Sequence, residues 1–315
     1  MLRTQDGSVT VRPTLTTTVA KEYVHRAALA EVFLTGWNRV APDSFVVTAQ
    51  WPRTHSFYSS EYGTHDPLLL CETIRQCGLL LTHTAYDVPF GYQLSWSRLQ
   101  YSANPRALHT APTPAEITLH VKCTDVRYHR TLPASMSMHM EAVRDGSLLS
   151  IATVKFGQHS PNVYRRLRGG RGDAASVFST APKPPDPVAL DLVGRTCSRD
   201  IVLSPTSEHR RWNLRVDTTH PVLFDHPVDH VPGMLLLESI RQAGHALAPS
   251  NGAMAPTSMD VSFNRYVEFD SPCWIEAEPS PSDNTPGRRP IRVNAVQDGS
   301  FAFTASAEMT DVSNL

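Results

Sequence analysis

Two long apolar segments, at about 67–83 and 233–247, are interrupted by polar residues at helical spacing. Each segment carries a glutamate, an arginine three positions later and a glutamine directly after the arginine. The members of this repeated motif are Glu72, Arg75 and Gln76 in the first segment and Glu238, Arg241 and Gln242 in the second. Residues at this spacing lie on one side of a helix. Because a buried charge is costly unless it is paired or used, the pattern predicts two buried helices with a polar stripe each.

Alternating apolar and polar positions flank both helices in the same order. One strand is expected before each helix, at 45–49 and 212–216, and four strands after it. The later strands are predicted near 93–102, 116–128, 135–144 and 148–157 in the first half, and near 258–268, 273–278, 290–297 and 300–309 in the second. Asp145-Gly146 and Asp298-Gly299 predict tight turns between the last two strands of each half. This order favours an α+β fold in which a curved antiparallel sheet wraps a long helix.

The chain therefore reads as two copies of one domain. Trp96-Ser97-Arg98 matches Phe263-Asn264-Arg265 as an aromatic, a small polar residue and an arginine, and the period is too long for a solenoid. We expect a tandem hotdog, in which one chain supplies both halves of a continuous sheet. The expected parts are an N-terminal domain at 20–160, a linker rich in Pro, Arg and Gly at 161–188, and a C-terminal domain at 189–312.

Composition and charge exclude several classes of protein. The net charge of −1 argues against nucleic acid as the main partner, which needs a basic face. The chain has no apolar run long enough to span a bilayer, and residues 1–7 lack the apolar core of a signal peptide. An odd number of scattered cysteines, 5 in all, indicates reduced thiols in a cytoplasmic protein. Their spacing shows no zinc signature, and we expect no metal.

The starts of the two predicted helices suggest chemistry. A proline lies in the first turn of each, in Asp66-Pro67 and in Pro232-Gly233, and Asp66 is a candidate N-cap. Backbone N–H groups at a helix start can bind a carbonyl or phosphate oxygen. The histidines just outside these starts are His65, His226 and His230. With Glu and Arg one turn inward, such a site could polarise a thioester and move protons. We favour the second helix start as the thioester end.

A simpler reading is that each Glu–Arg pair is only a structural ion pair. The repetition could then be a relic of the duplication. A functional role for at least one copy is favoured because a buried ion pair rarely stabilises more than apolar packing does. Arg98 and Arg265 are either exposed strand residues or phosphate contacts. The basic run at 165–171 is either solvated linker or a docking patch for an acidic carrier protein.

The second helix start resembles the active-site segment of the hotdog 3-hydroxyacyl-carrier-protein dehydratases. The matching residues are Pro232, Gly233, Leu235, Glu238 and Gln242. Those dehydratases place a catalytic histidine fourteen residues before the glutamate. That position is Phe224 in the second copy and Tyr58 in the first, so the resemblance does not extend to dehydratase chemistry.

A closer resemblance is to the A-factor synthase family, and it runs from about Val24 to Met309. The segments that carry it are Thr48–Pro52, Asp66–Leu68, Glu72–Gln76 and Pro232–Glu238. The family implies transfer of a β-ketoacyl group from acyl carrier protein to a hydroxyl of dihydroxyacetone phosphate. The ester then closes to a butenolide phosphate, a precursor of γ-butyrolactone or furan signalling molecules. The family implies no cofactor and no metal.

The resemblance assigns activity to Glu72, Arg75, Glu238 and Arg241. We add His230, which competes with the two glutamates for the role of general base. The residues expected to bind substrate are Gln76, Gln242, Arg98, Arg265, His65 and Gly233. A hydratase, a dehydratase, a thioesterase and a non-catalytic acyl-binding module stay open as alternatives. So do the acyl chain length, the final product, the number of working motifs, and a monomer or a homodimer.

Overall fold

The computed structural model describes residues 16–58, 62–247, 253–281 and 286–313. The N-terminal residues 1–7, which bear on a signal peptide, lie outside this range. The elements of the first half are β1 (Leu34–Ala41), β2 (Ser44–Trp51), α1 (Pro67–Thr84), β3 (Gln93–Ala103), β4 (Ala115–His129), β5 (Leu132–Arg144) and β6 (Ser147–His159). Those of the second half are β7 (Leu203–Ser204), β8 (Arg211–Leu214), α4 (Gly233–Leu247), β9 (Met254–Phe263), β10 (Cys273–Pro279), β11 (Arg288–Gln297) and β12 (Ser300–Asp311).

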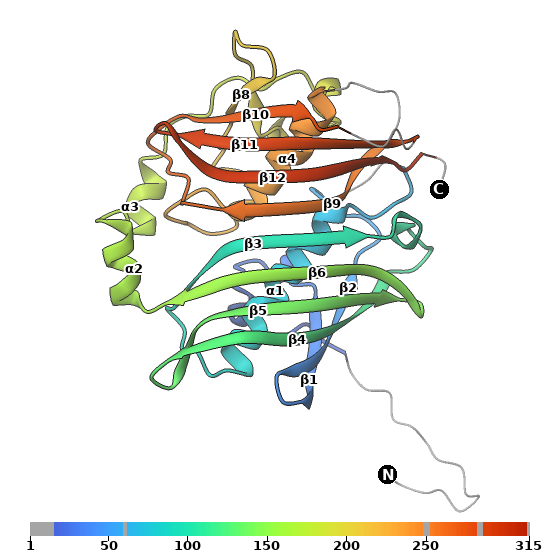
Figure 1. The fold of residues 1–315 in the computed structure, drawn as a ribbon, viewed down its shortest axis with the longest axis vertical. Coiled ribbons are helices and arrows are strands. Elements are labelled where there is room, and N and C mark those ends of the chain that lie inside the picture. Colours follow the sequence, from blue (N-terminus) through green and yellow to red (C-terminus); the bar gives the residue numbers. More distant parts are fainter. Residues whose placement is uncertain (1–15, 59–61, 248–252, 282–285, 314–315) are drawn as a thin grey trace, which may run out of the picture.

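The strands form one antiparallel sheet of 12 strands in the order β1-β2-β4-β5-β6-β3-β9-β12-β11-β10-β8-β7. The halves meet where β3 pairs with β9, from Arg98 opposite Ser262 to Ser102 opposite Ser258. Moving outward from this seam, the strands of the two halves follow each other in equivalent order. Both long helices lie on the same side of the sheet, one behind each half (Figure 1). The expected tandem hotdog is confirmed.

Helix α1 is buried along almost its whole length because its side chains are apolar nearly all round. Pro67 occupies the first helical position, where its missing N–H costs nothing. The carboxylate of Asp66 caps the helix by accepting the N–H of Leu68 at 2.8 Å. Helix α4 is buried in the same way but starts at Gly233 without an acidic residue before it. The two helices therefore differ mainly at their N-terminal ends.

Three features differ from the sequence-based expectation. Strands β1 and β7 were not predicted, and β9 (Met254–Phe263) lies several residues before the strand predicted near 258–268. The segment 161–188, predicted as a linker, contains helices α2 (Pro161–Arg168) and α3 (Ala174–Ser179), which lie beside the sheet at the junction of the halves (Figure 1). A short polar stretch between Gly and Pro residues carries too few apolar positions to show a helical period.

The third difference is the register of the repeat around Arg98 and Arg265. Asn104 and Asn264 occupy equivalent places after β3 and β9, because their N–H groups donate to Leu149 and Ala302 on the neighbouring strands. Arg98 therefore lies within β3, whereas Arg265 follows the end of β9. The predicted match between Trp96-Ser97-Arg98 and Phe263-Asn264-Arg265 is therefore wrong, because these segments do not occupy equivalent positions in the two halves.

Candidate active site

The glutamate of the first motif is fully buried and fully hydrogen-bonded. Glu72 accepts Nε of Arg26 at 3.0 Å, two nitrogens of Arg75 at 2.8 Å each, and the amide of Gln76 at 2.7 Å. Burial raises the pKa of Glu72, but Arg26 and Arg75 outweigh it and lower the pKa to about 2. Glu72 is therefore a permanent anion that holds Arg75 in a fixed orientation.

The second motif repeats this network. Glu238 accepts Nε of Arg195 at 3.0 Å, Nε of Arg241 at 2.9 Å and the amide of Gln242. Burial raises its pKa, and Arg195 and Arg241 together lower it to about 2. The sequence analysis missed Arg26 and Arg195, which precede their glutamates by 46 and 43 residues. The signal that could have found them is short, a valine two residues before each arginine.

The two glutamines and the two added arginines fasten the network to the rest of the fold. Gln76 accepts the N–H of Phe33 at 3.0 Å and donates to the carbonyl of Glu31 at 2.7 Å. Gln242 makes the equivalent pair of bonds, with Val202 at 2.9 Å and Asp200 at 2.8 Å.

The added arginines also cross between the halves. Arg26 donates to the carbonyl of Val222 at 3.0 Å, and Arg195 donates to that of Phe57 at 2.6 Å. In both copies the motif thus locks the two halves together.

A cavity of about 590 Å³ lies between the halves, and only one of the two motifs reaches it. Arg75 projects into it from α1, with 22% of its side chain exposed, and Gly233 borders it at the start of α4. The expectation that each helix start works with its own Glu and Arg is therefore replaced, since the cavity combines the start of α4 with the arginine of α1. Glu238, Arg241 and Gln242 do not line it.

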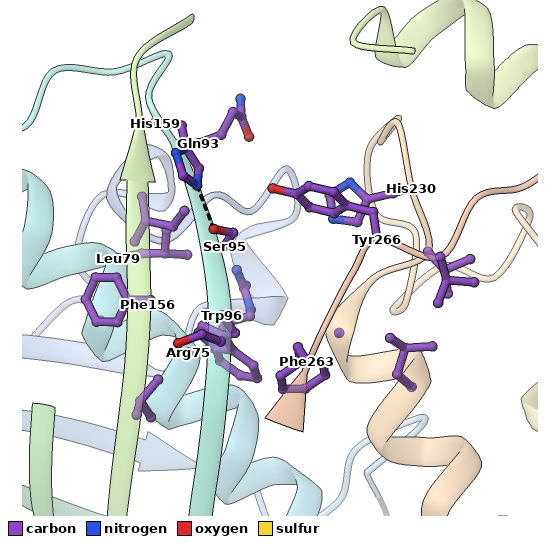
Figure 2. Close-up of a pocket in the computed structure, with 18 of the residues that line it drawn as sticks. Arg75, Leu79, Gln93, Ser95, Trp96, Phe156, His159, His230, Phe263 and Tyr266 are labelled. Carbon is purple, nitrogen blue, oxygen red and sulfur yellow. Dashed lines mark hydrogen bonds between the residues drawn. The ribbon is translucent and has the colours of Figure 1, made fainter. Parts of the chain in front are cut away.

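The cavity has an apolar part and a polar part (Figure 2). Its apolar walls come from both halves and are Ile74, Leu79, Trp96, Met140, Val154, Phe156, Leu236 and Phe263. Its polar lining includes His25, Arg75, Gln93, Ser95, His159, His230, Asn264 and Arg265. An apolar pocket with a few converging polar groups is typical of a small-molecule site. This one is shaped for a ligand with an apolar chain and a polar head.

The start of α4 offers hydrogen-bond donors to the cavity. The N–H groups of Gly233 and Met234 donate to no group in the described part of the chain. Free N–H groups and the helix dipole together favour a partial negative charge at this end. At the start of α1 the corresponding donors are missing, because Pro67 has no N–H and Leu68 donates to Asp66. Of these two helix starts, that of α4 is therefore the one with N–H groups left to bind a carbonyl oxygen.

His230 stands at the polar end of the cavity as half of a His–Asp dyad. Its Nδ1 lies 2.7 Å from Oδ1 of Asp229. Burial raises the pKa of Asp229, but the His230 bond leads the contacts that lower it to about 2. An imidazole that donates from Nδ1 to the Asp229 carboxylate has Nε2 left as a proton acceptor. In the first copy Gly63 and Thr64 occupy these two positions, so the dyad exists once.

Helix α2 positions this dyad. Tyr164 donates to Asp229 at 2.8 Å, and Arg168 donates to it at 3.1 Å. Arg168 also forms a bidentate ion pair with Glu268, at 2.6 and 2.7 Å, and lies over the ring of Tyr266. Arg168 is therefore buried. The expectation that the basic run at 165–171 is either solvated linker or a docking patch is wrong for this arginine.

Four of the expected substrate-binding residues do not line the cavity: Gln76 and Gln242, which belong to the buried networks, and Arg98 and His65. Arg98 is exposed on β3 and pairs with Asp260 across the seam, at 2.5 Å. His65 is buried near the start of α1, with its ring against Trp51, and burial together with Arg144 lowers its pKa to about 4. Arg265 does line the cavity, and its exposed side chain forms no ion pair within the described ranges.

Two further polar groups at the cavity were not singled out from the sequence. Nε2 of His159 lies 2.8 Å from the hydroxyl of Ser95 (Figure 2). Nδ1 of His83 donates to the carbonyl of Val88, so its Nε2 accepts the Nε2 proton of His25 at 2.8 Å. Burial, with Arg75 nearby, lowers the pKa of His25 to about 3. His25 is therefore neutral and presents Nδ1 as an acceptor.

The described ranges contain no group of three or more His, Cys, Asp or Glu side chains placed to hold a metal ion. Among the helices in these ranges, none is long and apolar enough to cross a membrane.

The fold and the site define a double-hotdog protein with one acyl-sized cavity between its halves. The chain matches the model of the A-factor biosynthesis hotdog domain twice, at residues 9–158 and 178–313, and it belongs to this A-factor synthase family. It is 46% identical over 291 residues to a 2-oxo-3-(phosphooxy)propyl 3-oxoalkanoate synthase of Streptomyces virginiae, covering 92% of this chain and 97% of the relative. The synthase of the same name from Streptomyces coelicolor is 40% identical, with coverages of 89% and 88%.

Solved structures confirm the fold. An acyl-ACP thioesterase from Bacteroides thetaiotaomicron superposes with a TM-score of 0.50, covering 84% of this chain and 97% of that one. Its sequence identity is 13%, so this likeness supports the double-hotdog architecture alone.

Proposed function

We propose that this protein transfers a β-ketoacyl group from a carrier-protein thioester to the hydroxyl of dihydroxyacetone phosphate. The names of its relatives describe the product of this transfer, a 2-oxo-3-(phosphooxy)propyl 3-oxoalkanoate. The observation that carries the proposal is the cavity between the halves, in which a helix start, an arginine and a His–Asp dyad meet beside an apolar wall.

In this proposal the acyl chain lies against the apolar walls and the thioester carbonyl points at the start of α4. The N–H groups of Gly233 and Met234 then bind the oxyanion that develops when the carbonyl is attacked. Arg75 supplies a positive charge beside it, and Glu72 orients Arg75 without touching the substrate. Glu238 and Arg241 form the equivalent network, which does not line this cavity and stabilises the fold.

His230 is the general base. Its Nε2 takes the proton of the acceptor hydroxyl while that oxygen attacks the thioester carbon. Collapse of the tetrahedral intermediate breaks the carbon–sulfur bond, and the proton on His230 passes to the departing thiolate. An ester and a free carrier thiol result, with no change of oxidation state. Asp229 stabilises the imidazolium that exists between the two proton transfers.

The ester can then close to a butenolide phosphate. Its methylene lies between two carbonyls and is acidic, and it faces the ketone of the transferred acceptor across a five-membered ring. Attack of this carbon on the ketone and loss of water give the butenolide. Such a compound is a precursor of γ-butyrolactone-type signalling molecules, in keeping with the family to which the chain belongs.

Mass spectrometry after mixing the protein with a β-ketoacyl thioester and dihydroxyacetone phosphate tests the proposal. We expect the phosphorylated ester or its butenolide, formed in proportion to the thiol released. Free acid in place of the ester would assign a thioesterase. Reversible hydration of an enoyl thioester would assign a hydratase. Thioester binding without turnover, seen as a rise in melting temperature, would assign an acyl-binding module.

A further inference from the structure

A second cavity, of about 580 Å³, adjoins the first at the polar end. The two share His25, Gln93 and His230, so the base of the proposed reaction stands on the border between them. The remaining lining of the second cavity comes from helix α2, from the segment that follows it, and from the loop before α4. Those residues include Tyr164, Arg165, Asp173, His226 and Asp229, and Gly91 adds the loop between α1 and β3.

The second cavity is lined by none of the large aliphatic and indole side chains of the first, and it adds cationic and donor groups. Arg165 lines it with an exposed side chain that forms no ion pair with any residue the structure describes. Nδ1 of His226 lies 2.5 Å from Asp225, which leaves Nε2 for a ligand. In its protonated form His226 donates from both ring nitrogens, to Asp225 and to an anion.

The two carboxylates in the lining are already engaged. Asp229 is held by Arg168, Tyr164 and the ring of His230. Asp173 caps α3 by accepting the N–H of Ser176 at 3.3 Å. Arg165 therefore meets no unengaged carboxylate here, and the cavity favours a small anion.

We propose that the second cavity binds the phosphate of the acyl acceptor, between Arg165 and His226, and so delivers the acceptor hydroxyl to His230. This assignment rests on the proposed function and names the place of its second substrate. In dihydroxyacetone phosphate three carbons separate the phosphate oxygen from the reacting hydroxyl. A phosphate in the second cavity thus lets the hydroxyl reach the border, where the acyl group waits in the first cavity.

The same chemistry could come from another source, the phosphate of the pantetheine arm on the carrier protein. The two sources differ in which substrate loses affinity when the site is damaged. Arg165→Gln and His226→Asn remove the proposed contacts. Arg166→Gln is the matched control, because Arg166 is an exposed neighbour on the same helix that does not line the cavity.

Steady-state kinetics with each substrate varied in turn and calorimetry with dihydroxyacetone phosphate alone test the assignment. Loss of a charge-assisted hydrogen bond should raise KM and Kd for dihydroxyacetone phosphate by about tenfold or more in Arg165→Gln and in His226→Asn. KM for the thioester should not change, and Arg166→Gln should match the wild type. Unphosphorylated dihydroxyacetone, a poorer acceptor, should be used equally well by the wild type and Arg165→Gln.

Inorganic phosphate should compete with dihydroxyacetone phosphate in the wild type and lose this effect in Arg165→Gln. Unchanged affinity for the acceptor in both variants would overturn the assignment. A rise in KM for the carrier thioester alone would overturn it too, and would give the site to the pantetheine phosphate. The calorimetry does not depend on turnover. Acceptor binding that weakens in the variants of a protein without transferase activity would refute the proposed function and keep the phosphate site.

Discussion

The two copies of the repeated motif have nearly the same internal geometry and different surroundings. In each, a buried glutamate binds two arginines and a glutamine, and its pKa is lowered to about 2. Yet Arg75 reaches the cavity between the halves, whereas Arg241 is buried near Asp66 at the start of α1. The motif therefore does not decide where a site can exist. The opposite helix start decides it, through Asp66-Pro67 on one side and Pro232-Gly233 on the other.

The start of α1 has no free N–H donor in its first two positions, for a simple physical reason. Asp66 satisfies the N–H of Leu68, and Pro67 has none, so a carbonyl oxygen placed there would find no donor. The Asp66 charge also acts on buried Arg241, whose pKa is raised, although burial itself lowers it, because Glu238 and Asp66 favour the cation. In the second copy a substrate can take the place that Asp66 occupies in the first.

The largest difference between the copies should come from the histidines. His230→Asn removes the proposed base and should lower kcat by about a thousandfold. His65→Asn, beside the start of α1, should leave kcat within about twofold, because His65 lines neither cavity. Single-turnover rates on variants with checked circular dichroism provide the measurement. Similar losses in both variants would place a reacting group at the first start as well.

A proline at the start of α4 would make it resemble the start of α1, where Pro67 has no N–H. Gly233→Pro deletes one N–H at the first helical position, where proline is well tolerated, and should lower kcat by about a hundredfold. Gly233→Ala is the control, since it keeps the N–H and its Cβ would lie 3.7 Å from Trp96, an ordinary contact. Equal rates for the two variants, measured with saturating thioester, would show that this N–H binds no oxyanion.

The arginines should separate activity from stability. Arg75→Gln should lower kcat/KM by about ten- to a hundredfold, the loss of a charged hydrogen bond, with a small change in melting temperature. Arg241→Gln leaves Glu238 with one arginine in a closed interior. It should lower the free energy of unfolding by about 3 kcal/mol or more and leave kcat of the folded fraction near wild type. Urea unfolding and steady-state kinetics on both variants provide the measurement. Loss of stability in Arg75→Gln together with loss of activity in Arg241→Gln would contradict this assignment.

Acid should act on the two copies alike. Glu72 and Glu238 have pKa values lowered from 4.5 to about 2, so their contribution to stability is complete above pH 4.5 and is lost as the pH falls toward 2. The shift corresponds to about 3 kcal/mol for each group. Urea unfolding between pH 6 and 2.5 should show this loss, and Glu72→Gln and Glu238→Gln should reduce it equally. Unequal slopes would mean that the two networks differ in strength.

The sequence predicted the elements whose periodicity is long and regular. The helix at about 67–83, the presence of four later strands in each half and the tandem hotdog follow from such patterns and are confirmed, although β9 lies several residues earlier than predicted. The match of Arg98 with Arg265 was wrong because three residue types in a row are too little to fix the register of two strands. Helix α2 was not predicted because most of its residues are charged or polar, so its sequence shows no apolar periodicity.

The site itself could be predicted only in part. Arg75, Gly233 and His230 were singled out, and the structure brings all three to one cavity. It does not bring Arg241, His65 or Arg98 there. Arg26, Arg195, Tyr164 and Arg168 were missed because each acts through a partner far away in the sequence. One sequence shows that a charged stripe needs partners, but only the fold shows where they come from.

The junction of β3 and β9 makes one polypeptide of what two identical hotdogs would form by pairing. In such a homodimer every substitution is made twice, so an Asp-Pro start would silence both sites at once. Fusion into one chain removes this constraint, since each half can mutate alone. The cavity between the halves uses them unequally, with the helix start of one half and the arginine of the other. The doubled motif thus records a division of labour that became possible when one gene encoded both halves.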